Sequence, residues 1–119
     1  MNRPIATPVV HLELQTADLA RARAFYTELF GWSAETVRVG AANYLAFELG
    51  VGIQGGVVER EGEPAWLPYV EVPNIGDTTE RARLLGAVVR LGPREGPAGW
   101  RCVIAVPSGA EIALWQPKT

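Results

Sequence analysis

The segment HLELQTADLARARAFYTELFGW, residues 11–32, carries the clearest structural signal in the chain. Its first four residues alternate between polar and apolar, which predicts a strand with His11 and Glu13 on one face. From Asp18 onward apolar residues recur at helical spacing, and Gly31 is a natural helix stop. The segment therefore predicts a strand followed by an amphipathic helix. The chain's only histidine and a carboxylate share one face of that strand.

A second copy of this pattern begins at Tyr69. The stretch Tyr69-Val70-Glu71-Val72 repeats the alternation of residues 11–14 at an offset of 58, and a second helix is expected at about residues 78–85, capped by Asp77. Each helix precedes three further strand-like segments, although the Gly- and Pro-rich stretch 92–99 reads as a loop and a candidate lid. The order predicts two βαβββ modules in tandem.

These two modules, at about residues 9–60 and 66–117, are expected to form a single domain of residues 1–119. The predicted fold class is α+β. Curved mixed sheets would surround a cleft, and the helices would cover the outer faces.

Composition excludes several classes of function. The net charge is −2 and the sequence pI is about 5.4, which argues against nucleic acid as a partner. No apolar run approaches the length needed to cross a membrane, and no signal peptide is visible. The one cysteine, Cys102, cannot form an internal disulfide, which fits a reducing compartment. We therefore expect a cytoplasmic protein that binds neither nucleic acid nor membrane.

The order and spacing of several short motifs resemble those of the vicinal oxygen chelate superfamily. This superfamily includes glyoxalase I, extradiol dioxygenases, methylmalonyl-CoA epimerase and the bleomycin-resistance proteins. The resemblance covers nearly the whole chain and is greatest to small, single-domain, glyoxalase-like bacterial members. The matching segments are 11–14, 18–19, 25–26, 29–32, 106–109 and 112–117.

The resemblance implies positions for a divalent metal, because the first and fourth strands of each module supply its ligands in the superfamily. These positions fall on His11 and Tyr69 for the two first strands, and around Gln54 to Gly56 and on Ala113 for the two fourth strands. Only His11 is a strong metal ligand, since a neutral tyrosine binds poorly and alanine has no donor atom. The resemblance therefore implies an incomplete metal site, and no cofactor is expected.

Two other arrangements of the polar residues remain open. A displaced divalent metal site would combine His11 with Glu13, Glu71 and Glu111, which strand alternation directs to the same inner face. Alternatively, His11 and Glu13 would form a catalytic acid–base pair without a metal. Against both stands a purely structural role, in which a neighbouring side chain hydrogen-bonds the histidine and the glutamates are solvated.

Aromatic and polar side chains are also candidates for contacts with a small organic ligand. Aromatic walls with a few carboxylates suit a flat or cationic molecule. The predicted ligand-binding residues are Gln54, Tyr69, Glu71, Trp100, Glu111 and Trp115.

The sequence thus predicts a glyoxalase-like, small-molecule-binding protein of the sequestration or bleomycin-resistance type, with an incomplete metal site. The alternative is an enzyme of the lyase, isomerase or dioxygenase type that uses His11 and the cleft glutamates, with or without a divalent metal. By resemblance the protein is expected to form a homodimer.

Overall fold

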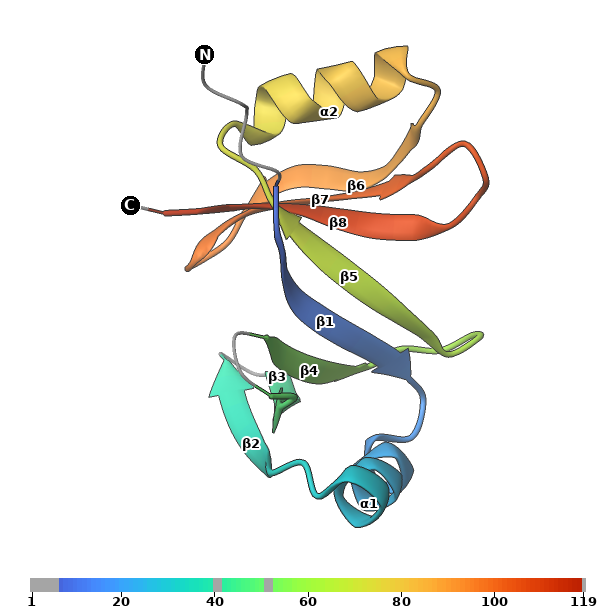
Figure 1. Ribbon diagram of the computed structural model, residues 1–119, viewed down its shortest axis with the longest axis vertical. Coiled ribbons are helices and arrows are strands. Elements are labelled where there is room, and N and C mark those ends of the chain that lie inside the picture. Colours follow the sequence, from blue (N-terminus) through green and yellow to red (C-terminus); the bar gives the residue numbers. More distant parts are fainter. Residues whose placement is uncertain (1–6, 40–41, 51–52, 119) are drawn as a thin grey trace. The chain divides into compact units, whose positions relative to one another are not determined.

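The computed structural model describes residues 7–39, 42–50 and 53–118. Within these ranges it contains eight strands and two helices (Figure 1). Their order is β1 (Val9–Thr16), α1 (Leu19–Phe30), β2 (Ala34–Val39), β3 (Ala42–Glu48), β4 (Gln54–Glu59), β5 (Ala65–Glu71), α2 (Ile75–Leu84), β6 (Val88–Glu95), β7 (Gly99–Ala105) and β8 (Glu111–Pro117). Within the described ranges, neither helix is long and apolar enough to cross a membrane.

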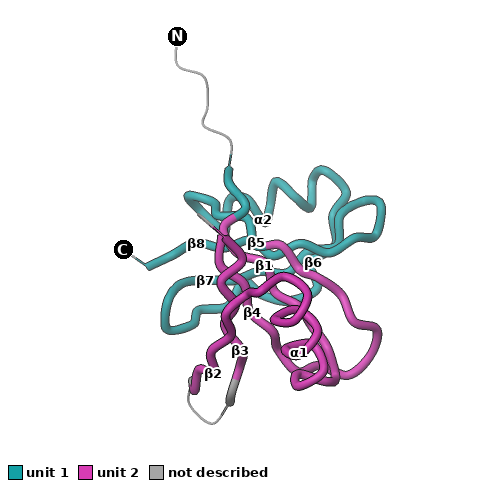
Figure 2. The backbone as a smooth tube through the Cα atoms, turned by 60° about the horizontal axis from the view of Figure 1, so that its bottom comes forward, with its two compact units in different colours: residues 1–9, 69–119 teal, residues 10–68 magenta. Residues whose placement is uncertain are grey.

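The chain divides into two compact units, which Figure 2 distinguishes by colour. Unit 2 consists of residues 10–68 and holds α1 with strands β2 to β4 and most of β1. Unit 1 consists of residues 1–9 and 69–119 and holds α2 with strands β6 to β8 and the end of β5. The element order is strand, helix and three strands, twice over, so the predicted α+β fold with tandem βαβββ modules is confirmed.

In unit 2 the strand order is β2-β3-β4-β1. Strand β4 runs parallel to β1 and antiparallel to β3, and β2 is antiparallel to β3. Leu14, Leu45, Phe47 and Val57 form the buried core of the unit. The partly buried residues that pack against this core include three from α1, namely Leu19, Ala22 and Tyr26.

Unit 1 repeats this arrangement with the order β5-β8-β7-β6. Strand β5 runs parallel to β8, while β7 is antiparallel to both β8 and β6. The buried core contains Val72, Ile75, Cys102, Ile104 and Leu114. The two units therefore share one topology, in which the first strand of the module pairs in parallel with the last.

Side-chain caps fix where each helix begins. The Asp18 carboxylate accepts a hydrogen bond of 3.0 Å from the backbone N–H of Arg21 at the start of α1. At α2 the cap is the Asn74 side chain, which accepts from the backbone N–H of Asp77 at 2.9 Å. The predicted cap at Asp77 was therefore wrong, because Asn74 closes the first turn three residues earlier.

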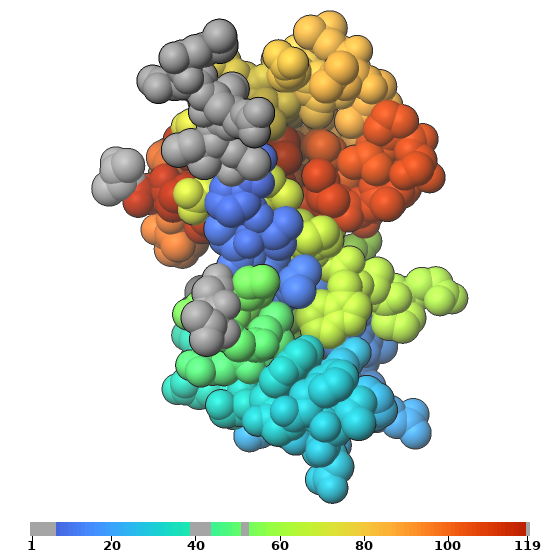
Figure 3. All heavy atoms as spheres, in the orientation of Figure 1, coloured from blue at the N-terminus to red at the C-terminus, as the bar shows by residue number. Residues whose placement is uncertain are grey.

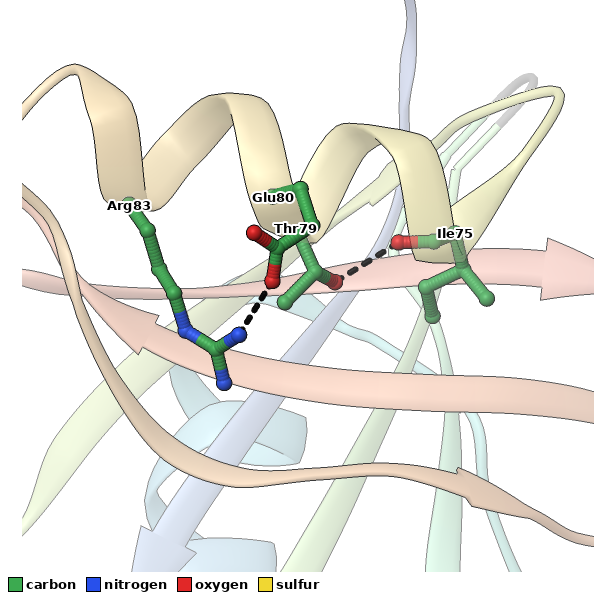
Figure 4. Close-up of polar contacts among 4 residues, drawn as sticks. All are labelled: Ile75, Thr79, Glu80 and Arg83. Carbon is green, nitrogen blue, oxygen red and sulfur yellow. Dashed lines mark hydrogen bonds and ion pairs between the residues drawn. The ribbon is translucent and has the colours of Figure 1, made fainter.

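Within α2, polar contacts tie successive turns together (Figure 4). The Thr79 hydroxyl, only 2% exposed, donates to the backbone carbonyl of Ile75 at 2.6 Å. Glu80 and Arg83 form an ion pair on the exposed side. The buried threonine hydroxyl thus has a local partner, as burial of a polar group requires.

The predicted loop at residues 92–99 is mostly strand. Strand β6 continues to Glu95 and β7 begins at Gly99, so only three residues connect them. The β6–β7 ladder shifts register on both sides of Leu91. At Gly92, φ is +83° and an added Cβ would lie 2.5 Å from the carbonyl oxygen of Arg101. Gly92 therefore allows β6 to be irregular and still pair closely with β7. Composition alone does not distinguish such a strand from a loop.

Candidate functional site

Strand β1 carries a row of polar side chains on the face that points away from α1. Its pleat directs Leu12 and Leu14 to one side, and Leu14 is buried in the core of unit 2. His11, Glu13 and Gln15 alternate with them and therefore share the opposite face. Glu13 and Gln15 are only 7% and 9% exposed. This row, called the β1 polar row below, contains both predicted catalytic residues.

The imidazole of His11 lies against the backbone of the neighbouring strand. His11 is in register with Gln54, and a Cβ added at Gly56 would lie 3.3 Å from His11 Nε2. Burial lowers the pKa of His11 below its ordinary value, and the negative charge of Glu13 opposes that shift without cancelling it. The imidazole is therefore mainly neutral at neutral pH and can accept a proton or a hydrogen bond.

Two residues that the sequence did not single out form a chain of hydrogen bonds that ends at Glu13. They are Gln15, a member of the β1 polar row, and Arg60, which contacts Gln15. The Gln15 amide Nε2 donates to Glu13 Oε2 at 3.1 Å, and the Arg60 guanidinium donates to Gln15 Oε1 at 2.6 Å. Arg60 directly follows β4, and its backbone N–H donates to the Thr16 carbonyl at 2.9 Å. The sequence contained one usable signal, since strand alternation places Gln15 beside Glu13. Nothing local indicated Arg60, which is 45 residues away from Gln15.

In unit 1 the predicted residues Tyr69 and Trp115 come together on one face. Tyr69 is in register with Ala113, and Glu71 is in register with Trp115. The Tyr69 and Trp115 rings are 6.4 Å apart between centroids, and the Tyr69 hydroxyl accepts from the Arg101 guanidinium at 3.1 Å. Since Val70 packs toward the core beneath α2, Tyr69 and Glu71 lie on the opposite face.

The remaining predicted residues are arranged differently. Trp100 packs against the core cluster on the α2 side, and Lys118 lies over its ring at 5.6 Å. Glu111 is half-exposed and forms an ion pair with Arg90 at 3.8 Å. Gln54 is exposed beside His11 in unit 2. Trp100 thus serves the core of unit 1, whereas Glu111 lies on the same face as Trp115 by alternation along β8.

The described residues do not bring together a set of donor atoms that could bind a metal ion. Among residues 7–39, 42–50 and 53–118, no group of three or more His, Cys, Asp or Glu side chains could hold a metal ion. The displaced set of His11, Glu13, Glu71 and Glu111 divides between the units, with two members in each. It remains a prediction.

Helix α1 presents an apolar surface that the sequence did not predict. None of its twelve residues is buried, and Phe25, Leu29 and Phe30 are 56%, 58% and 54% exposed. The helix is the cyan segment at the surface in Figure 3. An open pocket of about 350 Å³ lies beside it, lined in part by Leu14, Phe25 and Pro64. This pocket contains none of the predicted site residues, because it opens on the α1 side of unit 2.

A family model described as bleomycin resistance protein-like N-terminal matches residues 9–42. Protein CFP32 of Mycobacterium tuberculosis, named as a glyoxylase, is 29% identical over 114 residues, or 88% of this chain and 44% of that protein. The anthracycline biosynthesis protein DauV of Streptomyces sp. (strain C5) is 29% identical over 123 residues, or 87% of this chain and 45% of its own. The chain therefore spans less than half the length of these curated relatives.

Among solved structures, methylmalonyl-CoA epimerase from Mycobacterium tuberculosis superposes with a TM-score of 0.67. The match covers 93% of this chain and 88% of the epimerase, at 18% sequence identity. At that identity the likeness is one of fold.

Proposed function

We propose that this chain is a member of the vicinal oxygen chelate superfamily and that it is a small-molecule-binding protein of the sequestration or resistance type. The proposal includes an incomplete metal site. The activities of the longer relatives are candidate activities for this chain.

The observation that carries this proposal is the strand register at the superfamily's metal positions. His11 pairs with Gln54 on β4, and Tyr69 pairs with Ala113 on β8. From the expected range Gln54 to Gly56 we therefore take Gln54, the residue in register with His11, as the fourth-strand position in unit 2. One imidazole, one amide, one phenol and one methyl group stand where a metal enzyme needs about three strong ligands.

The surroundings of Tyr69 also fit a metal poorly. Its hydroxyl accepts a hydrogen bond from the Arg101 guanidinium at 3.1 Å. A divalent cation at this oxygen would be repelled by the neighbouring positive charge. The four residues therefore do not fit the metal that the superfamily implies.

The ligand we propose is flat, aromatic and cationic. Tyr69 and Trp115 supply two ring faces in unit 1, and Glu71 lies on the same side of β5. Within unit 2 by itself, Glu13 offers a buried carboxylate to a donor group. The description of the matching family model, bleomycin resistance, and the name of one relative, anthracycline biosynthesis, suggest that such compounds are suitable probes.

One observation favours an enzyme as the second candidate. His11 and Glu13 share a strand face, and the charge of Glu13 acts on the imidazole. A partly buried histidine whose pKa is lowered is available as a general base at neutral pH. In this alternative His11 would take a proton from the bound molecule, as in an isomerase or lyase.

The proposal extends to a homodimer in the cytoplasm. Cys102 is the sole cysteine and is fully buried, which suits a reducing compartment. Sedimentation equilibrium over a hundredfold range of protein concentration would give the oligomeric state. A mass that stays that of one 12.9 kDa chain would contradict the dimer.

Metal analysis tests the incomplete site. Protein purified without chelator should contain no stoichiometric nickel, zinc, manganese or iron, and titration with each should give no tight binding. Stoichiometric binding that is abolished in His11→Ala would overturn the proposal and favour a metal-dependent enzyme.

A tryptophan-fluorescence titration with an anthracycline and with bleomycin tests ligand binding. Quenching should occur without any change in the drug, and Trp115→Phe should reduce it. Trp32→Phe is the matched control, because Trp32 packs against the core of unit 2. Turnover of a tested compound would favour the enzyme, whereas identical quenching in both variants would contradict a site at Trp115.

A further inference from the structure

We infer that Arg60 and Gln15 are positioning residues that hold the Glu13 carboxylate in one orientation beside His11. The three side chains form a continuous chain of hydrogen bonds, Arg60 to Gln15 at 2.6 Å and Gln15 to Glu13 at 3.1 Å. The role in ligand binding rests on the proposed function. The orientation of Glu13 is a property of the ligand-free chain and is tested separately.

The chemistry at both ends fixes which way the Gln15 amide points. Arg60 can only donate, so it requires the amide oxygen on its side. A carboxylate accepts, so Glu13 requires the amide NH₂. Turning the amide over would place donor against donor at Arg60 and acceptor against acceptor at Glu13. The Arg60 guanidinium therefore fixes the Gln15 amide so that its NH₂ group, and not its oxygen, faces Glu13.

Burial makes this arrangement costly to break. Gln15 is 9% exposed and Glu13 is 7% exposed, so water has limited access to replace a lost partner. A buried polar group that loses its partner is left unsatisfied, which is unfavourable. The guanidinium–amide bond is charge-assisted and short, which strengthens it relative to a neutral pair.

The parallel ladder holds Arg60 in place. Thr16 on β1 is in register with Glu59 on β4, and the next bond of the ladder runs from the Arg60 N–H to the Thr16 carbonyl at 2.9 Å. The backbone of Arg60 is thus fixed two residues beyond Val58, which is in register with Gln15. The exposed Arg60 is in this way linked through Gln15 to the buried carboxylate of Glu13, two residues before Gln15 on β1.

The consequence for function is a carboxylate whose rotamer is set before a ligand arrives. A preorganised acceptor loses less side-chain entropy on binding than a mobile one. Such an acceptor favours ligands that donate, either through an N–H group or a protonated amine. The Arg60–Gln15 pair would therefore raise affinity for cationic ligands without touching them.

NMR of the ligand-free protein tests the orientation directly. The Gln15 side-chain amide protons should be shifted downfield and protected from exchange in the wild type. Arg60→Met should abolish this signature, because nothing then holds the amide oxygen, and Arg60→Lys should restore part of it. Arg23→Met, at another exposed arginine of unit 2, should leave it intact. An unchanged Gln15 amide in Arg60→Met would overturn the inference.

Binding of a cationic anthracycline tests the functional part. Arg60→Met should weaken binding about 5–10-fold, the effect of losing roughly 1 kcal/mol of orientation, while Arg23→Met should not. Equal affinity of Arg60→Met and wild type would show that Glu13 orientation does not serve this ligand. If the wild type itself fails to bind, the proposed function fails, and the NMR result still decides the orientation.

Discussion

At the scale of single residues, protonation of His11 makes the charge of the β1 polar row depend on pH. Its burial lowers the pKa in the folded chain, whereas the unfolded chain keeps a value of about 6.5. Between these two values the unfolded chain binds more protons, so stability rises with pH. The stability associated with neutral His11 is therefore fully present above about pH 6.5 and is lost as pH falls below it.

Substitution of His11 by Gln should remove this component of the pH dependence. Urea unfolding between pH 7.5 and 5 should show a steeper loss of stability in wild type than in His11→Gln. Both proteins carry the same carboxylates, so the difference between the two curves isolates the histidine. Parallel curves would mean that the folded and unfolded chains hold the His11 proton equally well.

The adjacent glycines of β4 allow a second test at this scale, because they face opposite sides of the strand. A Cβ at Gly56 would lie 3.3 Å from His11 Nε2, while one at Gly55 would lie 2.7 Å from Leu49 in the core. We expect Gly56→Ala to shift the single histidine resonance. Gly55→Ala should leave it unchanged and cost roughly 1–3 kcal/mol from overpacking. A histidine resonance that responds to both or to neither would contradict this assignment.

The sequence predicted part of the β1 polar row. Alternation placed His11 and Glu13 on one face, because a strand turns successive side chains to opposite sides. It did not identify Gln15 and Arg60 as functional, because glutamine and arginine near strand ends usually indicate solvent-exposed positions. Their contact depends on the parallel pairing of β1 with β4, which brings together residues 45 positions apart.

At the scale of elements, the start of α2 provides a direct comparison between the predicted and observed caps. Asn74 accepts from the Asp77 N–H, and Gln116 accepts from the Ile75 N–H at 2.8 Å. Asn74→Ala should therefore cost about 1 kcal/mol. Asp77→Ala should cost only about 0.3–1 kcal/mol, since Asp77 contributes its charge in the first turn. Thermal unfolding of the two variants would decide, and a larger loss in Asp77→Ala would favour the cap predicted from sequence.

The strands show which elements the sequence could predict. Alternation found β1 and β5, because each carries a polar face and an apolar face. It missed the second half of β6, where Gly92 and Pro93 resemble a loop in composition. Only the partner strand β7, in register at Arg94 and Arg101, shows that this segment is paired. Glycine and proline in a segment indicate which backbone conformations the segment can adopt. Whether it pairs as a strand depends on residues elsewhere in the chain.

At the scale of the whole molecule, the duplication was predictable because residues 11–14 and 69–72 repeat the same alternation. Each unit places its first strand parallel to its last, so the repeat in sequence corresponds to a repeat in topology. The repeat does not extend to chemistry. Where unit 2 has His11 beside Gln54, unit 1 has Tyr69 beside Ala113. Two copies of one scaffold thus carry different side chains at equivalent positions.

The two units should nevertheless unfold together, because β1 and β5 both cross the boundary between them. The boundary falls after Val9 in β1 and after Pro68 in β5. The three β5 residues in register with β8, Tyr69–Glu71, come directly after this boundary, so unfolding of unit 2 would leave their pairing at the unsupported start of unit 1. A three-residue strand adds little stability, so opening of one unit should destabilise the other.

Cys102 provides a probe for this cooperativity, since it is the only cysteine and is fully buried in unit 1. Leu45→Ala in unit 2 should cost about 2–5 kcal/mol, because Leu45 is 6% exposed and a cavity remains. Cooperative unfolding predicts that thiol labelling of Cys102 then accelerates by roughly 30-fold or more. Leu29→Ala, at an exposed position of the same unit, should leave the rate nearly unchanged. Wild-type labelling kinetics in Leu45→Ala would instead mean that unit 1 is stable while unit 2 opens.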